Sequence, residues 1–144
     1  MSEVEQFQLI VPATILDARA ATDTISNLCV RFSEQDLAMF STALMEILVN
    51  VVKHSYRLAD KAHMTVRVVF GKEAIKLVVE DVGCGMTTQQ FDMAPHEVNF
   101  DPTSTINLPE GGMGLAIVKS VMDGVQYEQV DGVNRMTAVR RWSA

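Results

Sequence analysis

The sequence has few cysteines and no long apolar run, and each shortage excludes a class of protein. Of the 144 residues only Cys29 and Cys84 are cysteines, and neither lies in the spacing of a disulfide framework or a zinc site. No run approaches the roughly 20 apolar residues that cross a bilayer, and the amino terminus lacks a basic region followed by an apolar segment. We therefore expect a soluble, unprocessed protein of the reducing cytoplasm that does not enter a membrane.

Basic residues are also scarce. The chain carries 12 lysines and arginines against 18 acidic residues, which gives a formal net charge of -6. Unspecific binding to nucleic acid depends on a basic surface that releases counterions, so this charge argues against direct contact with DNA or RNA. It does not exclude ATP, because a few backbone amides, one or two basic groups and a magnesium ion can bind phosphates locally.

Prolines are few, and they are unevenly distributed. Three of the four, Pro95, Pro102 and Pro109, lie between residues 86 and 110, in a stretch without sustained periodicity that is rich in Thr, Asn and Asp. A compact domain seldom contains so long a loop unless the loop acts as a lid or is disordered. We favour a lid over residues 86–110.

The rest of the sequence follows the two regular hydrophobic periods. Alternation predicts strands near residues 5–11, 64–70, 75–79, 125–130 and 136–139, and spacings of three and four predict helices after Thr14, over 34–56 and over 113–122. Turns at Gly71 and Gly132 would close two hairpins. We expect one domain, residues 1–144, with an α+β fold: a two-layer sandwich of a mixed, mainly antiparallel sheet and three main helices on one face.

Three polar segments stand out in this framework, and the first lies on the long predicted helix. Glu46 and Asn50 project opposite its buried stripe, and Lys53 and His54 continue the same face one turn onward. A solvated helix face would show the same pattern. Alternatively, the Asn50 carbonyl oxygen suits a single magnesium ligand, and Glu46 suits the base that accepts a proton in phosphoryl transfer. Lys53 would then contact a phosphate, unless it is an ordinary surface lysine.

The second segment follows a predicted strand. Asp81 stands at the carboxyl end of that strand, immediately before Gly83 and Gly85. A carboxylate there can accept a hydrogen bond from the adenine amino group, which guanine does not offer at that place, while the glycines let the backbone approach the base. The alternative is a simple Asp-Gly turn.

The third segment opens the last predicted helix. Gly111, Gly112 and Gly114 lack Cβ atoms, and the free N–H groups at a helix start attract phosphate. The segment differs from a Walker loop, because no Lys-Ser or Lys-Thr pair follows the glycines. A loop that merely caps a helix is the alternative. The three segments together predict a pocket for ATP and Mg²⁺.

In this order, the segments resemble the N, G1 and G2 boxes of the ATPase superfamily of gyrase, the Hsp90 chaperones, histidine kinases and MutL. The matching stretches are MEILVNVVKHSY, EDVGCGM and GGMGLAIVKSVMD. The resemblance implies the Bergerat-type ATP-binding fold, with Glu46 as the catalytic base, Asn50 as the magnesium ligand and Asp81 as the reader of adenine. The other residues implied to bind the nucleotide are Lys53, His54, Gly83, Gly85, Gly111, Gly112, Met113, Gly114 and Leu115.

The chain is most similar in kind to the small bacterial anti-sigma-factor serine kinases, because it leaves no room for the further domains of the larger members. This resemblance implies a homodimer that sequesters an alternative sigma factor, or that phosphorylates a serine of a small antagonist protein with ATP. Two other interpretations remain open. One is a nucleotide-dependent binding module without phosphotransfer, and the other is a detached histidine-kinase catalytic domain.

Overall fold

The computed structural model describes residues 5–56, 61–94 and 114–144. Its elements are, in chain order, β1 (Glu5–Pro12), α1 (Ile15–Leu28), α2 (Glu34–Asn50), the π-helical turn η1 (Val51–Ser55), β2 (His63–Phe70), β3 (Ala74–Asp81), α3 (Thr88–Met93), α4 (Gly114–Val121), β4 (Gly124–Val130) and β5 (Val133–Arg141). Every helix and strand predicted from periodicity is present, with bounds that differ by a few residues.

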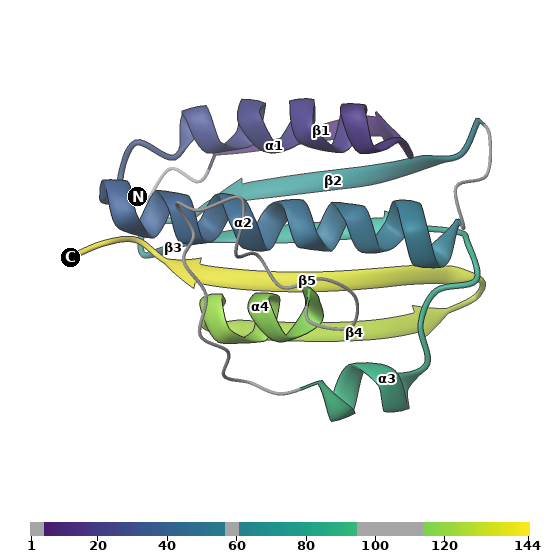
Figure 1. Ribbon diagram of the computed structural model, residues 1–144. Coiled ribbons are helices and arrows are strands. Elements are labelled where there is room, and N and C mark those ends of the chain that lie inside the picture. Colours follow the sequence, from purple (N-terminus) through teal and green to yellow (C-terminus); the bar gives the residue numbers. More distant parts are fainter. Residues whose placement is uncertain (1–4, 57–60, 95–113) are drawn as a thin grey trace, which may run out of the picture.

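The five strands form one sheet in the order β1-β2-β3-β5-β4. All four pairings are antiparallel, so the expectation of a mixed sheet is wrong, whereas the expected two-layer α+β architecture is confirmed. Figure 1 shows α1, α2 and α4 lying across the same face of the sheet. The core lies between these layers, and its largest fully buried side chains include Phe40, Ile25, Leu44, Leu48, Leu77 and Ile117.

The opposite face of the sheet carries the polar side chains of the strands, because successive side chains of a strand point to opposite faces and the apolar ones face the helices. A row of charges crosses it, in which Glu80 pairs with Arg67 at 3.1 Å and with Arg135 at 2.9 Å, and Arg135 also pairs with Glu128 at 2.8 Å. These residues come from four neighbouring strands. Partly exposed ion pairs add little stability, so the row serves mainly to keep this face of the sheet polar.

The central helix begins at a cap and ends in a wider turn. Ser33 Oγ accepts a hydrogen bond from the Asp36 amide, as expected for an N-cap. The helical stretch Glu34–Ser55 is 22 residues long with a mean hydropathy of 1.3, so by length and composition alone it could cross a membrane. The sequence led us to expect no stretch that is long and apolar enough to cross a membrane. In the fold, however, the stretch packs between α1 and α4 and covers the sheet.

A short helix, α3, occupies the first part of the predicted lid, where no helix was expected. Two reciprocal hydrogen bonds cap its amino-terminal end: Thr87 Oγ1 accepts one from the Gln90 amide, and the Gln90 side-chain oxygen accepts one from the Thr87 amide. This capping box is visible in the sequence as Thr-x-x-Gln, but the helix is only six residues long and has no apolar period. Residues 95–110 of the predicted lid lie outside the described residues.

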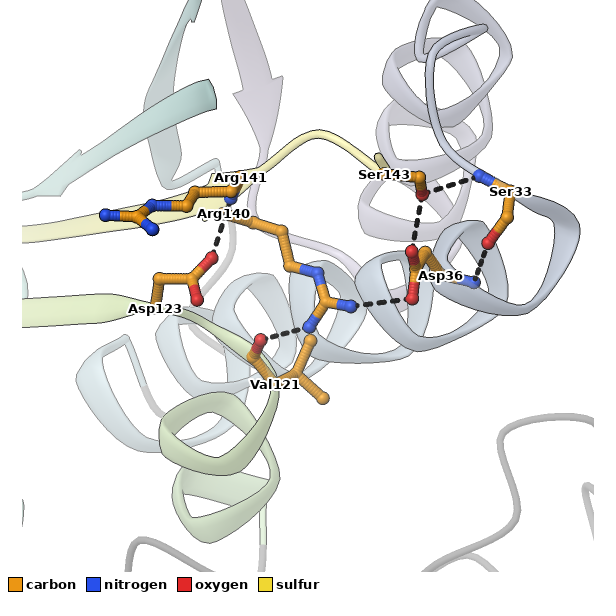
Figure 2. A network of polar contacts seen from close by, with 7 residues as sticks. All are labelled: Ser33, Asp36, Val121, Asp123, Arg140, Arg141 and Ser143. Atoms are coloured by element: carbon orange, nitrogen blue, oxygen red, sulfur yellow. Dashed lines mark hydrogen bonds and ion pairs between the residues drawn. The ribbon is translucent and has the colours of Figure 1, made fainter. Parts of the chain in front are cut away.

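A polar network ties the end of β5 to two helices (Figure 2). Arg140 donates to Asp36 Oδ1 at 2.9 Å and to the carbonyl oxygen of Val121, the last residue of α4. Ser143 donates to the other oxygen of Asp36 and accepts from the Ser33 amide at 2.8 Å. The network therefore fixes the start of α2 against the end of α4. The first residue of α4, Gly114, lies at the other end of α2, near Glu46 and Asn50.

Candidate functional site

A pocket opens beside the carboxyl end of β3. It contains about 360 Å³ of empty space, open solvent included. Its apolar walls come from Ile47, Val51, Val79, Met86 and Met136, and its polar groups from Asn50, His54, Ser55, Asp81 and Tyr127. Apolar walls with a few convergent polar groups suit a flat heteroaromatic ring such as a nucleobase.

Asp81 supplies the buried carboxylate of this pocket, with only 8% of the residue exposed. Its Oδ1 accepts hydrogen bonds from Ser55 Oγ, from the Gly83 amide at 2.9 Å and from Asn134 Nδ2 at 2.8 Å. Within the described part of the chain, Oδ2 receives no hydrogen bond. One oxygen is thus fixed by the protein, and the other is available to accept from a ligand amino group.

The wider turn at the end of α2 places Ser55 beside Asp81. The π-helical bond, from the Tyr56 amide to the Val51 carbonyl at 2.9 Å, ends the helix there. The Ser55 carbonyl, at the end of the helix, accepts a hydrogen bond from the Cys84 amide at 2.9 Å, and Ser55 Oγ accepts one from the Gly85 amide at 3.0 Å. Because helix-end carbonyls need partners, the loop after β3 caps the helix and is fixed by it. π-turns are frequent at functional sites.

The two glycines of this loop are required by the protein's own groups. A Cβ atom on Gly83 would lie 2.6 Å from Ser55 Oγ, and one on Gly85 would lie 2.5 Å from both Asn134 Oδ1 and the Tyr127 hydroxyl. Gly85 also has a φ of 69°, a conformation that side chains disfavour. Sequence reasoning assigned the glycines to the approach of a base, but the crowding already present in the chain is sufficient to require them.

Glu46 and Asn50 face the start of α4 rather than open solvent. A Cβ atom on Gly114 would clash with Glu46 Oε2 and would lie 3.8 Å from Asn50 Oδ1. Both side chains are half-buried. Burial raises the pKa of Glu46 above its ordinary value, and the positive charge of Lys53 opposes that shift. The first and third polar segments, 64 residues apart from Asn50 to Gly114 in sequence (114 − 50), therefore meet in the fold.

The remaining predicted residues divide into three groups. His54 lines the pocket, and Lys53 is exposed near Glu46. The Leu115 side chain belongs to the apolar core, so only its backbone amide could face a ligand. The predicted residues that lie outside the described part of the structure are Gly111, Gly112 and Met113.

Asn50 fits the role of a magnesium ligand by its donor chemistry. Its side-chain oxygen is near the start of α4, where phosphate would bind. Among residues 5–56, 61–94 and 114–144, no group of three or more His, Cys, Asp or Glu side chains is placed to hold a metal ion. Magnesium held by one protein oxygen, phosphate oxygens and water requires no such group.

Three residues of the site were missed in the choice of candidate positions: Ser55, Asn134 and Tyr127. Asn134 is 4% exposed and donates to Asp81 Oδ1, to the Gly83 carbonyl at 2.9 Å and, more weakly, to Ser55 Oγ at 3.3 Å. The Tyr127 hydroxyl accepts from the Met86 amide at 3.0 Å. For Tyr127 and Asn134 the only signal in the sequence is that these polar side chains fall on inward-facing positions of β4 and β5, and Ser55 lies in the turn η1.

The comparison with known families agrees with this geometry. A family model of the histidine kinase-like ATPase domain matches residues 11–140. The chain belongs to this family. Two solved structures share the fold: the RsbU and RsbW domains of Rv1364c from Mycobacterium tuberculosis, with a TM-score of 0.65 at 16% identity, and the mycobacterial sensor histidine kinase MprB, with 0.56 at 18%. The aligned regions cover 97% and 96% of this chain, but 33% and 98% of the other chains.

Curated relatives resemble the chain over most of its length. The serine-protein kinase RsbW of Bacillus velezensis is 26% identical over 137 residues, which cover 92% of this chain and 83% of the relative. The protein of the same name from Listeria monocytogenes is 27% identical over 105 residues, which cover 72% of this chain and 65% of the relative. The expected resemblance to the superfamily, and to its small serine kinases, is thereby confirmed.

Proposed function

We propose that the protein is an ATP-dependent serine protein kinase and anti-sigma factor of a bacterial partner-switching system. Its substrate would be a serine of a small antagonist protein, and its other partner an alternative sigma factor. One observation carries the proposal: a half-buried carboxylate, Glu46, lies beside Asn50 at the start of the helix that follows the glycines. The names of the curated relatives support the serine kinase activity.

The nucleotide would bind with its base in the pocket and its phosphates toward α4. Asp81 Oδ2 would accept from the adenine amino group, and the apolar walls would cover the ring faces. The amides at the start of α4 would donate to phosphate oxygens. Asn50 would hold Mg²⁺, which neutralises charge that develops on the phosphate oxygens during transfer.

Glu46 would act as the general base. Its carboxylate accepts the proton of the substrate serine hydroxyl as the serine oxygen attacks the γ-phosphorus and the bond to the β,γ-bridging oxygen breaks, which releases ADP. Burial favours this role, because a carboxylate with a raised pKa is a better proton acceptor. Lys53, near the carboxylate, would contact a phosphate oxygen.

The proposal is tested by incubating the protein with γ-labelled ATP, Mg²⁺ and candidate antagonist proteins from the same genome. Wild type should produce acid-stable label on a serine of one antagonist. Glu46→Gln should bind ATP with similar affinity but transfer phosphate about 10²–10⁴ times more slowly, the usual effect of losing a general base. Asn50→Ala should reduce magnesium-dependent binding, and Asp81→Asn should reduce affinity for adenine nucleotides.

The two alternatives give different results in the same assay. Tight ATP binding without transfer to any antagonist, together with nucleotide-dependent capture of a sigma factor, would favour a binding module. Acid-labile label on a histidine would favour a detached histidine-kinase catalytic domain, an activity compatible with the similar fold of MprB. Unchanged adenine affinity in Asp81→Asn would contradict the assignment of the pocket itself. The proposed homodimer and the cytoplasmic location are checked by light scattering and by fractionation of cells.

A further inference from the structure

Lys119 on α4 is a buried charge that the proposed chemistry does not use. It is 8% exposed, and it is the one buried lysine or arginine among the residues that the structure describes. Across those same residues no carboxylate pairs with it. An ammonium group is costly to bury unless its donors are satisfied, so its partners indicate what it is there to hold.

The partners of Lys119 belong to the end of α3. Its Nζ donates to the carbonyl oxygen of Phe91 and, at 3.1 Å, to that of Ala94. It also lies 4.4 Å from the centroid of the Phe91 ring, in cation-π geometry. The carbonyls at the end of a helix are its negative pole, and a helix of six residues is not stable alone. Lys119 therefore holds the end of α3 in place through both electrostatic attraction and hydrogen bonds.

The contacts continue from α3 to the wall of the pocket. The Phe91 ring stacks on the Tyr127 ring with centroids 5.9 Å apart. The Tyr127 hydroxyl in turn accepts from the Met86 amide, and both Met86 and Tyr127 line the pocket. A continuous path of packed groups thus runs from the last turn of α4, through α3, to the pocket wall at Met86 and Tyr127.

We infer that Lys119 is a positioning residue for nucleotide binding. It holds α3 against α4, so that the pocket wall at Met86 and Tyr127 keeps its position relative to the start of α4 at Gly114. The inference rests on the proposed ATP site. In that site the base would touch the wall and the phosphates would touch the start of α4. A nucleotide spans the two, so its affinity depends on their relative position, and Lys119 acts without touching it.

The decisive variants separate the charge from the bulk of the side chain. Lys119→Met keeps an unbranched apolar stem on α4 but removes the ammonium group. Lys119→Arg keeps a cation with several donors above the Phe91 ring. Lys76→Met, on an exposed position of β3, is the matched control. Phe91→Leu removes the ring from the other side of the contact and provides a second test if Lys119→Met folds poorly.

Two measurements are made on each variant: hydrogen exchange of the α3 amides without nucleotide, and the Kd for ATP by calorimetry. Lys119→Met should raise the exchange rates of Phe91 and Ala94 about tenfold or more and raise the Kd about fivefold, the lower end of ordinary coupling between sites. Phe91→Leu should shift both in the same direction, whereas Lys119→Arg should recover most of each effect. The KM for ATP should rise with the Kd while kcat stays near that of wild type.

The results distinguish failure of this inference from failure of the proposed function. If wild type binds no ATP, the proposed function is wrong. If wild type binds ATP, but Lys119→Met has the same α3 exchange rates and the same Kd for ATP as Lys76→Met, then Lys119 does not position α3. Faster exchange of α3 with an unchanged Kd would also overturn the inference, because Lys119 would then be structural only.

Discussion

Asn134 offers a quantitative test of how the floor of the pocket is held together. Its side chain on β5 donates at 2.8 Å to Asp81 Oδ1 and at 2.9 Å to the Gly83 carbonyl, and its Oδ1 accepts at 2.8 Å from Gln129 Nε2. The residue is 4% exposed, so water cannot readily replace these bonds. Asn134→Ala removes these three bonds together with the weaker one to Ser55 Oγ at 3.3 Å, and leaves the carboxylate of Asp81 with fewer donors.

The expected cost follows from the kinds of bond that are lost. A hydrogen bond to a charged group contributes ~1.5–3 kcal/mol and one between neutral groups ~1 kcal/mol. Because the Gln129 side chain is exposed and can turn to water, its bond is counted as negligible. The free energy of unfolding should therefore fall by about 3 kcal/mol, which corresponds to a Tm lower by roughly 6–12 °C for a chain of this size.

The measurement is urea and thermal unfolding of Asn134→Ala beside Asn27→Ala, which removes an exposed amide from α1 as a matched control. The control should stay within about 0.5 kcal/mol of wild type, as surface substitutions usually do. Ser55→Ala should be non-additive with Asn134→Ala, because both side chains donate to the same oxygen of Asp81. If Asn134→Ala costs no more than Asn27→Ala, or if the two site variants add, the hydrogen-bonded floor described here is wrong.

Three further predictions concern other parts of the fold. Gly85→Ala should lose nucleotide binding and destabilise the chain by about 2–4 kcal/mol, whereas Gly132→Ala, which has a similar positive φ but no atom within 4 Å of the added Cβ, should cost about 1 kcal/mol in thermal unfolding. The hydrogen bond from Ser143 lowers the pKa of Asp36, so its contribution is present above the ordinary carboxyl pKa and is lost as the pH falls. Asp36→Asn should therefore cost about 1 kcal/mol in urea unfolding at pH 7, and the difference from wild type should shrink toward pH 2. The pKa of Glu46 is raised instead, so wild type loses stability as the pH rises through the folded-state pKa and the buried carboxyl becomes charged. In urea unfolding, Glu46→Gln should therefore be at least as stable as wild type at pH 8 and should lose that advantage below pH 4.

Hydrophobic periodicity was sufficient to predict the architecture, because both layers bury one regular face. The strands alternate, α1 and α2 begin directly after their N-caps Thr14 and Ser33, and the final hairpin turns at Gly132, all as their local sequences require. The short helix α3 escaped prediction because it has no apolar period of its own. Its position depends on Lys119, a residue 25 positions beyond Ala94, and no local rule contains that contact.

The candidate site was predictable only in part, for the same reason. Asp81 was recognised because it occurs together with the other two polar segments, since a carboxylate before glycines could by itself be a simple Asp-Gly turn. Asn134 and Ser55 were not, because an asparagine in a strand and a serine near a helix end are unremarkable until the register of β3 and β5 places Asp81 opposite Asn134. The role of Asn134 is fixed by pairing across the sheet, and that of Ser55 by the place where η1 ends beside β3, neither of which a single sequence displays.

Glu46 shows how the site sets one electrostatic effect against another. The start of α4 carries partial positive charge that favours a carboxylate, and so does Lys53, yet burial has the larger effect and the pKa is raised. A phosphate at the same helix start would bring negative charge close to Glu46 and share the favourable field of the helix. Both changes would raise the Glu46 pKa, whereas the magnesium ion proposed at Asn50 would lower it. The nucleotide and its metal would therefore act on the proposed base in opposite directions, at the position where Gly114 allows the helix and the carboxylate to meet.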